Sequence, residues 1–93
     1  MYKIIAVCAS GVGSSLMTKL YAQQIVDAEG IDASVENSDI TSLSPKDYDI
    51  IIPTSDFSEA LSGYEDKIVK VSNLTNKQEL RDVIVNKIKE LEG

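Results

Sequence analysis

Histidine is absent from the 93 residues, and the sequence contains a single cysteine, Cys8. Without histidine, a Ser-His-Asp triad, a His-ligated zinc site and a phosphohistidine carrier are all excluded. One cysteine excludes an internal disulfide, a Cys-x-x-Cys redox pair and a cysteine-cluster metal site. We therefore expect no metal and no cofactor, and any nucleophilic chemistry must use Cys8, a hydroxyl, a lysine or a carboxylate.

Positive charge and long apolar runs are also scarce. Nine Lys and Arg against fifteen Asp and Glu give a net charge of −6, which argues against a nucleic-acid partner and against a polybasic membrane contact. No apolar run approaches the length of a membrane span, and residues 1–11 lack the layout of a signal peptide. We expect one soluble domain over residues 1–93, located in the cytoplasm and not inserted in the membrane.

Strand and helix patterns alternate along the chain. Short apolar runs rich in β-branched residues predict strands at 2–7, 33–37, 49–53 and 67–71. Helical patterns predict helices at 14–29, 44–47, 55–62 and after a capping box formed by Thr75 and Gln78. This alternation predicts an α/β three-layer sandwich with a four-stranded parallel sheet of order 2-1-3-4 and helices on both faces.

Periodicity also assigns a buried face to each long helix. In the first helix the apolar residues that recur every three or four positions are Leu16, Met17, Leu20, Tyr21, Ile25 and Ala28. In the last helix they are Leu80, Val83, Ile84, Ile88 and Leu91. Gly30 is expected to cap the C-terminus of the first helix in a left-handed conformation.

One segment of the chain has the pattern of a phosphate site. It joins the first strand to the first helix and consists of Cys8, Ala9, Ser10, Gly11, Val12, Gly13, Ser14 and Ser15. The unpaired N–H groups of a helix N-terminus bind anions, and two glycines let the backbone fold closely around a phosphate. Such a loop would stabilise Cys8 as a thiolate nucleophile. A lone cysteine in an apolar run is usually a packing residue, but here the strand end, the glycines and the helix start coincide.

At these residues the chain resembles the IIB components of the bacterial phosphoenolpyruvate-dependent sugar phosphotransferase system, above all the ascorbate and galactitol group. The resemblance extends over essentially the whole chain, including the apolar strand at 49–53 and the ending that runs from residues 71–74 into a final helix. It implies that Cys8 is the phosphorylated residue and that residues 9–15 form the phosphate loop (P-loop).

The resemblance also implies an activity and partners. The expected activity is that of a protein-phosphohistidine–sugar phosphotransferase, a kinase-type transfer with a phosphocysteine intermediate. Phosphate would come from a phosphohistidine of a IIA protein and pass to a sugar, ascorbate or a relative, at a IIC membrane permease. The protein would then visit the inner face of the membrane only through IIC.

Two alternatives use the same loop. Low-molecular-weight tyrosine phosphatases share a Cys-x5-Arg loop after the first strand, but Ser14 stands at the arginine position here, and that guanidinium would clamp the transferring phosphoryl group. A non-catalytic anion-binding module is the other alternative. Asp56, Ser72 and Asn73 follow strands at the same predicted sheet edge, although capping and turn roles explain them as well.

Overall fold

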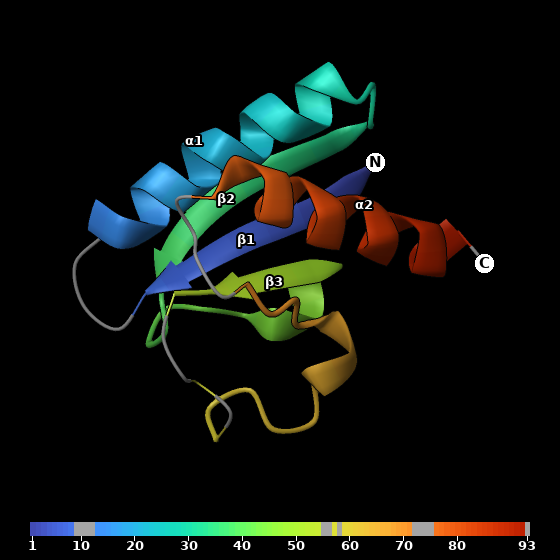
Figure 1. Ribbon diagram of the computed structural model, residues 1–93. Coiled ribbons are helices and arrows are strands. Elements are labelled where there is room, and N and C mark those ends of the chain that lie inside the picture. The colour runs from blue at the N-terminus through green and yellow to red at the C-terminus, as the bar shows by residue number, and fades with distance from the viewer. Residues whose placement is uncertain (9–12, 55–56, 58, 72–75, 93) are drawn as a thin grey trace.

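A computed structural model describes residues 1–8, 13–54, 57, 59–71 and 76–92, with the backbone alone described for residues 13–15. The elements in chain order are β1 (Tyr2–Cys8), α1 (Gly13–Ala28), β2 (Ala33–Asp39), η1 (Pro45–Asp47), β3 (Ile50–Pro53), η2 (Glu65–Lys67) and α2 (Lys77–Glu92). Strands and helices alternate as the sequence predicts, and both α-helices run back along the sheet (Figure 1).

The described residues form a three-stranded parallel sheet of order β2-β1-β3. Its middle strand, β1, pairs with β2 from Tyr2↔Ala33 to Cys8↔Asp39 and with β3 from Ile4↔Ile50 onward. Five consecutive residues of β1, from Ile4 to Cys8, are buried, because α1 covers one side of the strand and irregular segments cover the other. An unbroken apolar run is the sequence signature of such a strand.

The expected fourth strand, residues 67–71, is reduced to a single bridge. Ile51 and Ile68 form this parallel bridge, and the N–H of Val69 donates to the carbonyl of Ile51 at 3.0 Å. On this side of β3 the next residue that would donate to the ladder is Pro53, which has no N–H group. The ladder therefore stops after one step, and the prediction of four strands is wrong by one.

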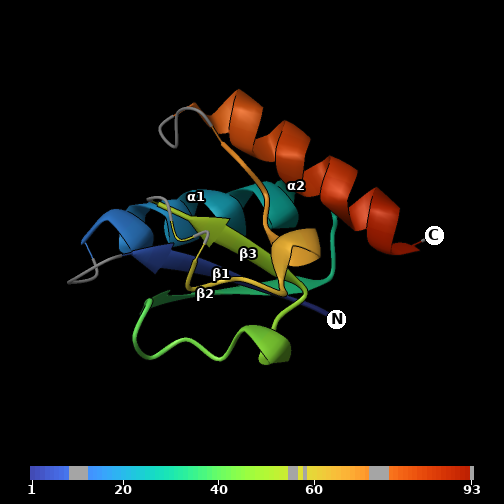
Figure 2. The same cartoon turned by 90° about the horizontal axis from the view of Figure 1, so that it is seen from below.

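The two faces of the sheet are covered differently. Figure 2 shows α1 and α2 together on one side, where Ile4, Ile50 and Ile52 form a core with both helices. On the other side, Ile51 packs with Leu61 and with partly buried residues of segments 40–48 and 57–68. The expected helices on both faces are thus not observed in the described residues. A short helix was expected at 55–62, but the described residues 59–63 form turns. The N–H of Leu61 donates to the carbonyl of Phe57 at 2.9 Å, and that of Ser62 donates to the carbonyl of Glu59 at 3.3 Å.

The ends of the long helices are set by local hydrogen bonds. Gly30, at φ +69°, ends α1: its N–H donates to Asp27 and that of Ile31 donates to Val26, which is a Schellman motif and confirms the predicted cap. At the start of α2, the side chain of Asn76 accepts from the N–H of Glu79 at 3.2 Å. Asn76 is therefore the N-cap, in place of the predicted Thr75, which lies outside the described residues.

The buried faces of the helices differ from the prediction at several positions. In α1, the side chains in the core are Thr18, Ala22, Ile25 and Val26. Leu16, Met17 and Leu20 were assigned to that face and are exposed instead, by 43%, 48% and 47%. In α2 the predicted Leu80, Ile84 and Ile88 are buried and Leu91 is exposed.

Candidate functional site

Cys8 is the last residue of the central strand, at the carboxyl edge of the sheet. Only 4% of its surface is exposed. Its Sγ lies 3.8 Å from the carbonyl oxygen of Ser38 on β2, in the geometry of a thiol that donates to a backbone acceptor. Because side chains alternate along a strand, Cys8 shares with Ile4 the face that α1 covers. The nucleophile candidate is therefore held by both the sheet and the helix layer.

The end of β2 lies directly beside Cys8. Asp39 is in register with Cys8, and the N–H of Ile40 donates to the carbonyl of Cys8 at 2.9 Å. The Asp39 carboxylate is engaged by its own turn: it accepts from the hydroxyl of Thr41 and, at 2.9 Å, from the N–H of Ser42. These two hydrogen bonds, the one from Thr41 first, lower the pKa of Asp39 below its ordinary value. The negative charge of Asp39 is thus satisfied by hydrogen bonds within the 39–42 turn.

The end of β3 is fastened to the residue before Cys8. The backbone N–H and the hydroxyl of Thr54 both donate to the carbonyl of Val7, each at 2.8 Å. Thr54 was not among the site residues predicted from the sequence. The sequence feature that could have identified it is a hydroxyl residue directly after a buried strand, because the carboxyl ends of parallel strands meet at one edge of the sheet.

The predicted phosphate loop is placed only at its two ends. Cys8 ends β1 and α1 begins at Gly13, so four residues connect them. Ala9, Ser10, Gly11 and Val12 lie outside the described residues, and Gly13, Ser14 and Ser15 form the first turn of α1, without described side chains. This helical turn contains no acidic residue. A helix N-terminus without acidic residues, separated from the cysteine by four residues, favours the binding of an anion.

The remaining polar candidates cannot be assigned to this edge. Asp56, Ser72 and Asn73 lie outside the described residues. Within the described ranges, no group of three or more Cys, Asp or Glu side chains could hold a metal ion. In the same part of the chain, no helix combines the length and the apolar character that a membrane crossing requires.

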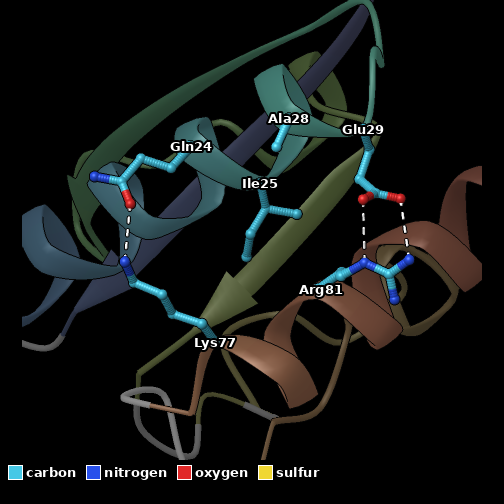
Figure 3. A pocket seen from close by; sticks show the side chains of 6 residues that line it. All are labelled: Gln24, Ile25, Ala28, Glu29, Lys77 and Arg81. Carbon is cyan, nitrogen blue, oxygen red and sulfur yellow. Dashed lines mark hydrogen bonds and ion pairs between the residues drawn. The ribbon is translucent and has the colours of Figure 1, made fainter.

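A hollow of about 210 Å³ separates the second half of α1 from the start of α2. Figure 3 shows its lining residues, Gln24, Ile25, Ala28, Glu29, Lys77 and Arg81. Arg81 binds both carboxylate oxygens of Glu29, at 3.1 and 3.2 Å, and Lys77 donates to Gln24 at 3.0 Å. These contacts tie the two helices together, so we read the hollow as an interhelical seam and not as a ligand site.

Chemically, the arrangement presents one sulfur nucleophile before a helix N-terminus. Transfer of a phosphoryl group to sulfur needs an in-line approach and stabilisation of the charge on the phosphate oxygens, which backbone N–H groups can supply.

Comparison with known proteins identifies a family and a fold. A family model described as "PTS system, Lactose/Cellobiose specific IIB subunit" matches residues 3–86. No curated protein matches the chain. The family description names lactose and cellobiose, so the expected ascorbate/galactitol subtype is not supported.

Similar solved structures include two YwlE mutants and a low-molecular-weight protein tyrosine phosphatase. A YwlE mutant from Bacillus subtilis has a TM-score of 0.67 at 14% identity, with all of both chains covered. A low-molecular-weight protein tyrosine phosphatase from Bacillus subtilis gives 0.62 at 14% identity, covering 95% of this chain and 97% of its own. A YwlE arginine phosphatase mutant with a phosphorylated active-site serine gives 0.64 at 13% identity, covering 97% and 95%. At these identities the likeness establishes a shared fold.

Proposed function

The chain belongs to the IIB family of the sugar phosphotransferase system, and on this basis we propose that it is a phosphoryl carrier with Cys8 as its phosphorylated residue. The observation that carries the proposal is the coincidence of the family match with the position of Cys8, the only cysteine, at the end of β1 and ahead of the N-terminus of α1. In a chain without histidine, no other side chain combines nucleophilicity with an anion-binding helix terminus.

The proposed cycle has two transfers. In the first, the P–N bond of a phosphohistidine on a IIA protein breaks and a P–S bond to Cys8 forms. The histidine nitrogen keeps the electron pair and gains the proton that the thiol loses. In the second, the P–S bond breaks, a sugar hydroxyl held by the IIC permease forms the new P–O bond, and its proton passes to a base. Sulfur keeps the electron pair and takes that proton back from the base, so the Cys8 thiol that enters the first transfer is regenerated.

Residues 9–15 are proposed to surround the phosphoryl group. Their sequence places two glycines among three serines before and within the first turn of α1. Backbone N–H groups of such a segment stabilise the nearly two negative charges of a phosphoryl group without any cationic side chain. The carrier would act in the cytoplasm and reach the membrane only through IIC.

The partner permease determines which sugar receives the phosphoryl group. The family description names lactose and cellobiose, so we propose disaccharides of this kind as the first substrates to examine. Uptake assays in a strain that lacks the protein test this directly: a defect confined to an unrelated sugar would contradict it.

The experiment that tests the carrier is phosphorylation followed by mass spectrometry. The protein is incubated with phosphoenolpyruvate, the general phosphotransferase proteins and a lactose/cellobiose-type IIA protein. We expect the mass of one phosphoryl group, located on Cys8 by fragmentation, and none on the Cys8→Ser or Cys8→Ala variant. A stable phosphate on either variant would show that Cys8 is not the acceptor.

A thiol phosphatase is the competing function, and the fold shared with phosphatases favours it. Ser14 at the arginine position opposes it, because a phosphatase needs charge stabilisation, a positioned water and a base for hydrolysis. The discriminating measurement is the decay of isolated phospho-Cys8 at neutral pH, with turnover of a chromogenic phosphate ester. Decay within seconds together with ester turnover would make the protein a phosphatase; a long-lived phosphocysteine supports the carrier. Slower decay in Asp56→Asn would assign that carboxylate as the base for residual hydrolysis.

A further inference from the structure

The first turns of α1 carry apolar side chains that the protein does not bury. Leu16, Met17 and Leu20 are 43%, 48% and 47% exposed. Positions three and four apart on a helix are neighbours, so Leu20 lies next to both of the others. We call these three residues the α1 stripe. It is one contiguous surface.

The α1 stripe is unusual for this chain. Five large hydrophobic residues are exposed among those described, and three of them form the stripe. The other two, Met1 and Leu91, lie at or near the chain ends. Scattered exposed apolar residues need no explanation, whereas a cluster marks an interaction surface. The core side of α1 is already complete without the stripe, because Ala22, Ile25 and Val26 pack on the sheet.

The α1 stripe is adjacent to the proposed phosphate loop. Leu16 is the fourth residue of α1, and the helix begins only five positions after Cys8. Helix α1 runs away from this edge of the sheet, as Figure 1 shows, so its first turns are the part nearest Cys8. A protein that covers the stripe would therefore also lie over the start of α1, at the edge of the sheet where β1 ends with Cys8.

The charge around the α1 stripe suits a phosphorylated partner. Residues 1–26 contain no Asp or Glu, although the whole chain has fifteen. Lys19 lies within the stripe's span, and Lys77 reaches α1 from α2, with its Nζ 4.7 Å from the ring centre of Tyr21. A dianionic phosphoryl group that approaches Cys8 along α1 therefore meets no carboxylate of residues 1–26, and the Asp39 carboxylate at the end of β2 is held by its own turn.

We propose that the α1 stripe is the docking surface for the phosphohistidine-bearing donor protein. This inference rests on the proposed function and adds where the donor binds. The donor's apolar surface covers Leu16, Met17 and Leu20, and carboxylates at its rim face Lys19 and Lys77. Burial of the α1 stripe holds the donor while its phosphohistidine lies in line with Cys8 Sγ.

The test compares serine variants of the α1 stripe with a matched control. Leu16→Ser, Leu20→Ser and the triple variant with Met17→Ser are measured against Leu91→Ser, whose leucine has the same 43% exposure but lies at the far end of α2. Transfer to Cys8 is followed with phosphorylated IIA of the lactose/cellobiose type. Each single variant should lower kcat/KM about threefold to tenfold and the triple at least about thirtyfold. The loss should appear in KM and not in kcat, and Leu91→Ser should match the wild type.

A small donor separates docking from chemistry. Phosphoramidate also carries a P–N bond but has no protein surface that could dock on the α1 stripe. All variants should therefore accept phosphate from it at the wild-type rate. A loss with phosphoramidate equal to that with IIA would mean that the substitutions damage the site, and would overturn the docking proposal. Unchanged kcat/KM with IIA would overturn it as well. Unchanged melting temperatures confirm that the variants fold.

Binding of unphosphorylated IIA, measured by calorimetry, makes the docking result independent of transfer. If wild type takes phosphate from neither donor, the carrier function fails, but loss of IIA binding only in the stripe variants still supports docking. If wild type accepts phosphate but the variants bind IIA normally, the docking inference alone fails. A wild-type dimer that the triple variant dissolves, with transfer unaffected, would make a second copy of this chain the occupant and refute the proposal.

Discussion

Thr54 offers a direct test of how the sheet positions Cys8. Its N–H and hydroxyl both donate to the carbonyl of Val7 at 2.8 Å. The Thr54→Val substitution keeps the side-chain shape and the backbone hydrogen bond but removes the hydroxyl donor. The carbonyl of Val7 retains one partner, so only the net value of a neutral hydrogen bond is lost, about 1 kcal/mol. In a domain of this size that corresponds to a fall in Tm of about 4–8 °C.

The assay is urea and thermal unfolding of wild type, Thr54→Val and Thr54→Ser. The serine variant keeps the hydroxyl and should retain most of the stability. Because Val7 precedes Cys8, phosphoryl transfer at saturating donor should also slow a few-fold in the valine variant and recover in the serine variant. If Thr54→Val were as stable as wild type, or if Thr54→Ser lost as much, the hydroxyl contact would have no energetic role and the reasoning would be refuted.

Three further predictions concern the layer beneath the sheet, the turn beside Cys8 and the loop itself. Lys67 donates to the carbonyls of Tyr48 and Pro45 at 2.7 and 3.3 Å, so Lys67→Met should lower the free energy of unfolding by about 2 kcal/mol. Substitution of the exposed Lys46 by Met should leave that free energy unchanged, and equal effects of the two substitutions in chemical denaturation would contradict the prediction. Asp39 has a pKa lowered from 3.8, so its stabilising contribution is present above that value and lost as pH falls through the lower folded pKa. NMR titration should show this lowered pKa, and Thr41→Val should move it upward; an unchanged titration would refute the assigned cause. Gly11→Val and Gly13→Val should impair transfer to Cys8 without unfolding the protein, because a β-branched side chain restricts the backbone; normal transfer in both would refute the nest of N–H groups.

The central part of the fold could be predicted because it depends on local patterns. The unbroken apolar runs of β1 and β3 identify strands that are buried on both faces, and Ile4, Ile51 and Ile52 are fully buried. Gly30 was recognisable because a left-handed residue ends a helix at little cost only when it lacks a Cβ. The sequence likewise placed Cys8 between a strand and a helix, and the structure confirms that position.

The fourth strand was overpredicted because its partner decides whether it forms. The KIVKV pattern of residues 67–71 is typical of a strand. Its ladder nevertheless depends on Pro53 of β3, which cannot donate beyond the Ile51–Ile68 bridge. The composition of a segment does not show whether its neighbour can supply the N–H groups of a ladder. That prediction requires knowing which residues of the neighbouring strand face the segment.

The N-cap of α2 was missed for a simpler reason. Both Thr75-x-x-Gln78 and Asn76-x-x-Glu79 fit the capping-box pattern, one residue apart. The hydrogen bond from the N–H of Glu79 to Asn76 selects the second. Asparagine is preferred over threonine at the N-cap, so residue preference already favoured Asn76 over the predicted Thr75.

The misassigned face of α1 has a physical cause that bears on function. Helical periodicity detects side chains that avoid water, and it cannot tell whether the protein's own core or a partner covers them. Leu16, Met17 and Leu20 satisfy the same spacing rule as Ile25, yet the sheet lies beneath Ile25 and not beneath them. A helix that rests on a sheet by one side and is apolar on another presents that second side for contact with a partner. That uncovered side lies within the segment without acidic residues and on the first turns of α1, the helix that follows Cys8. The error in the sequence prediction therefore falls where the proposed docking surface lies.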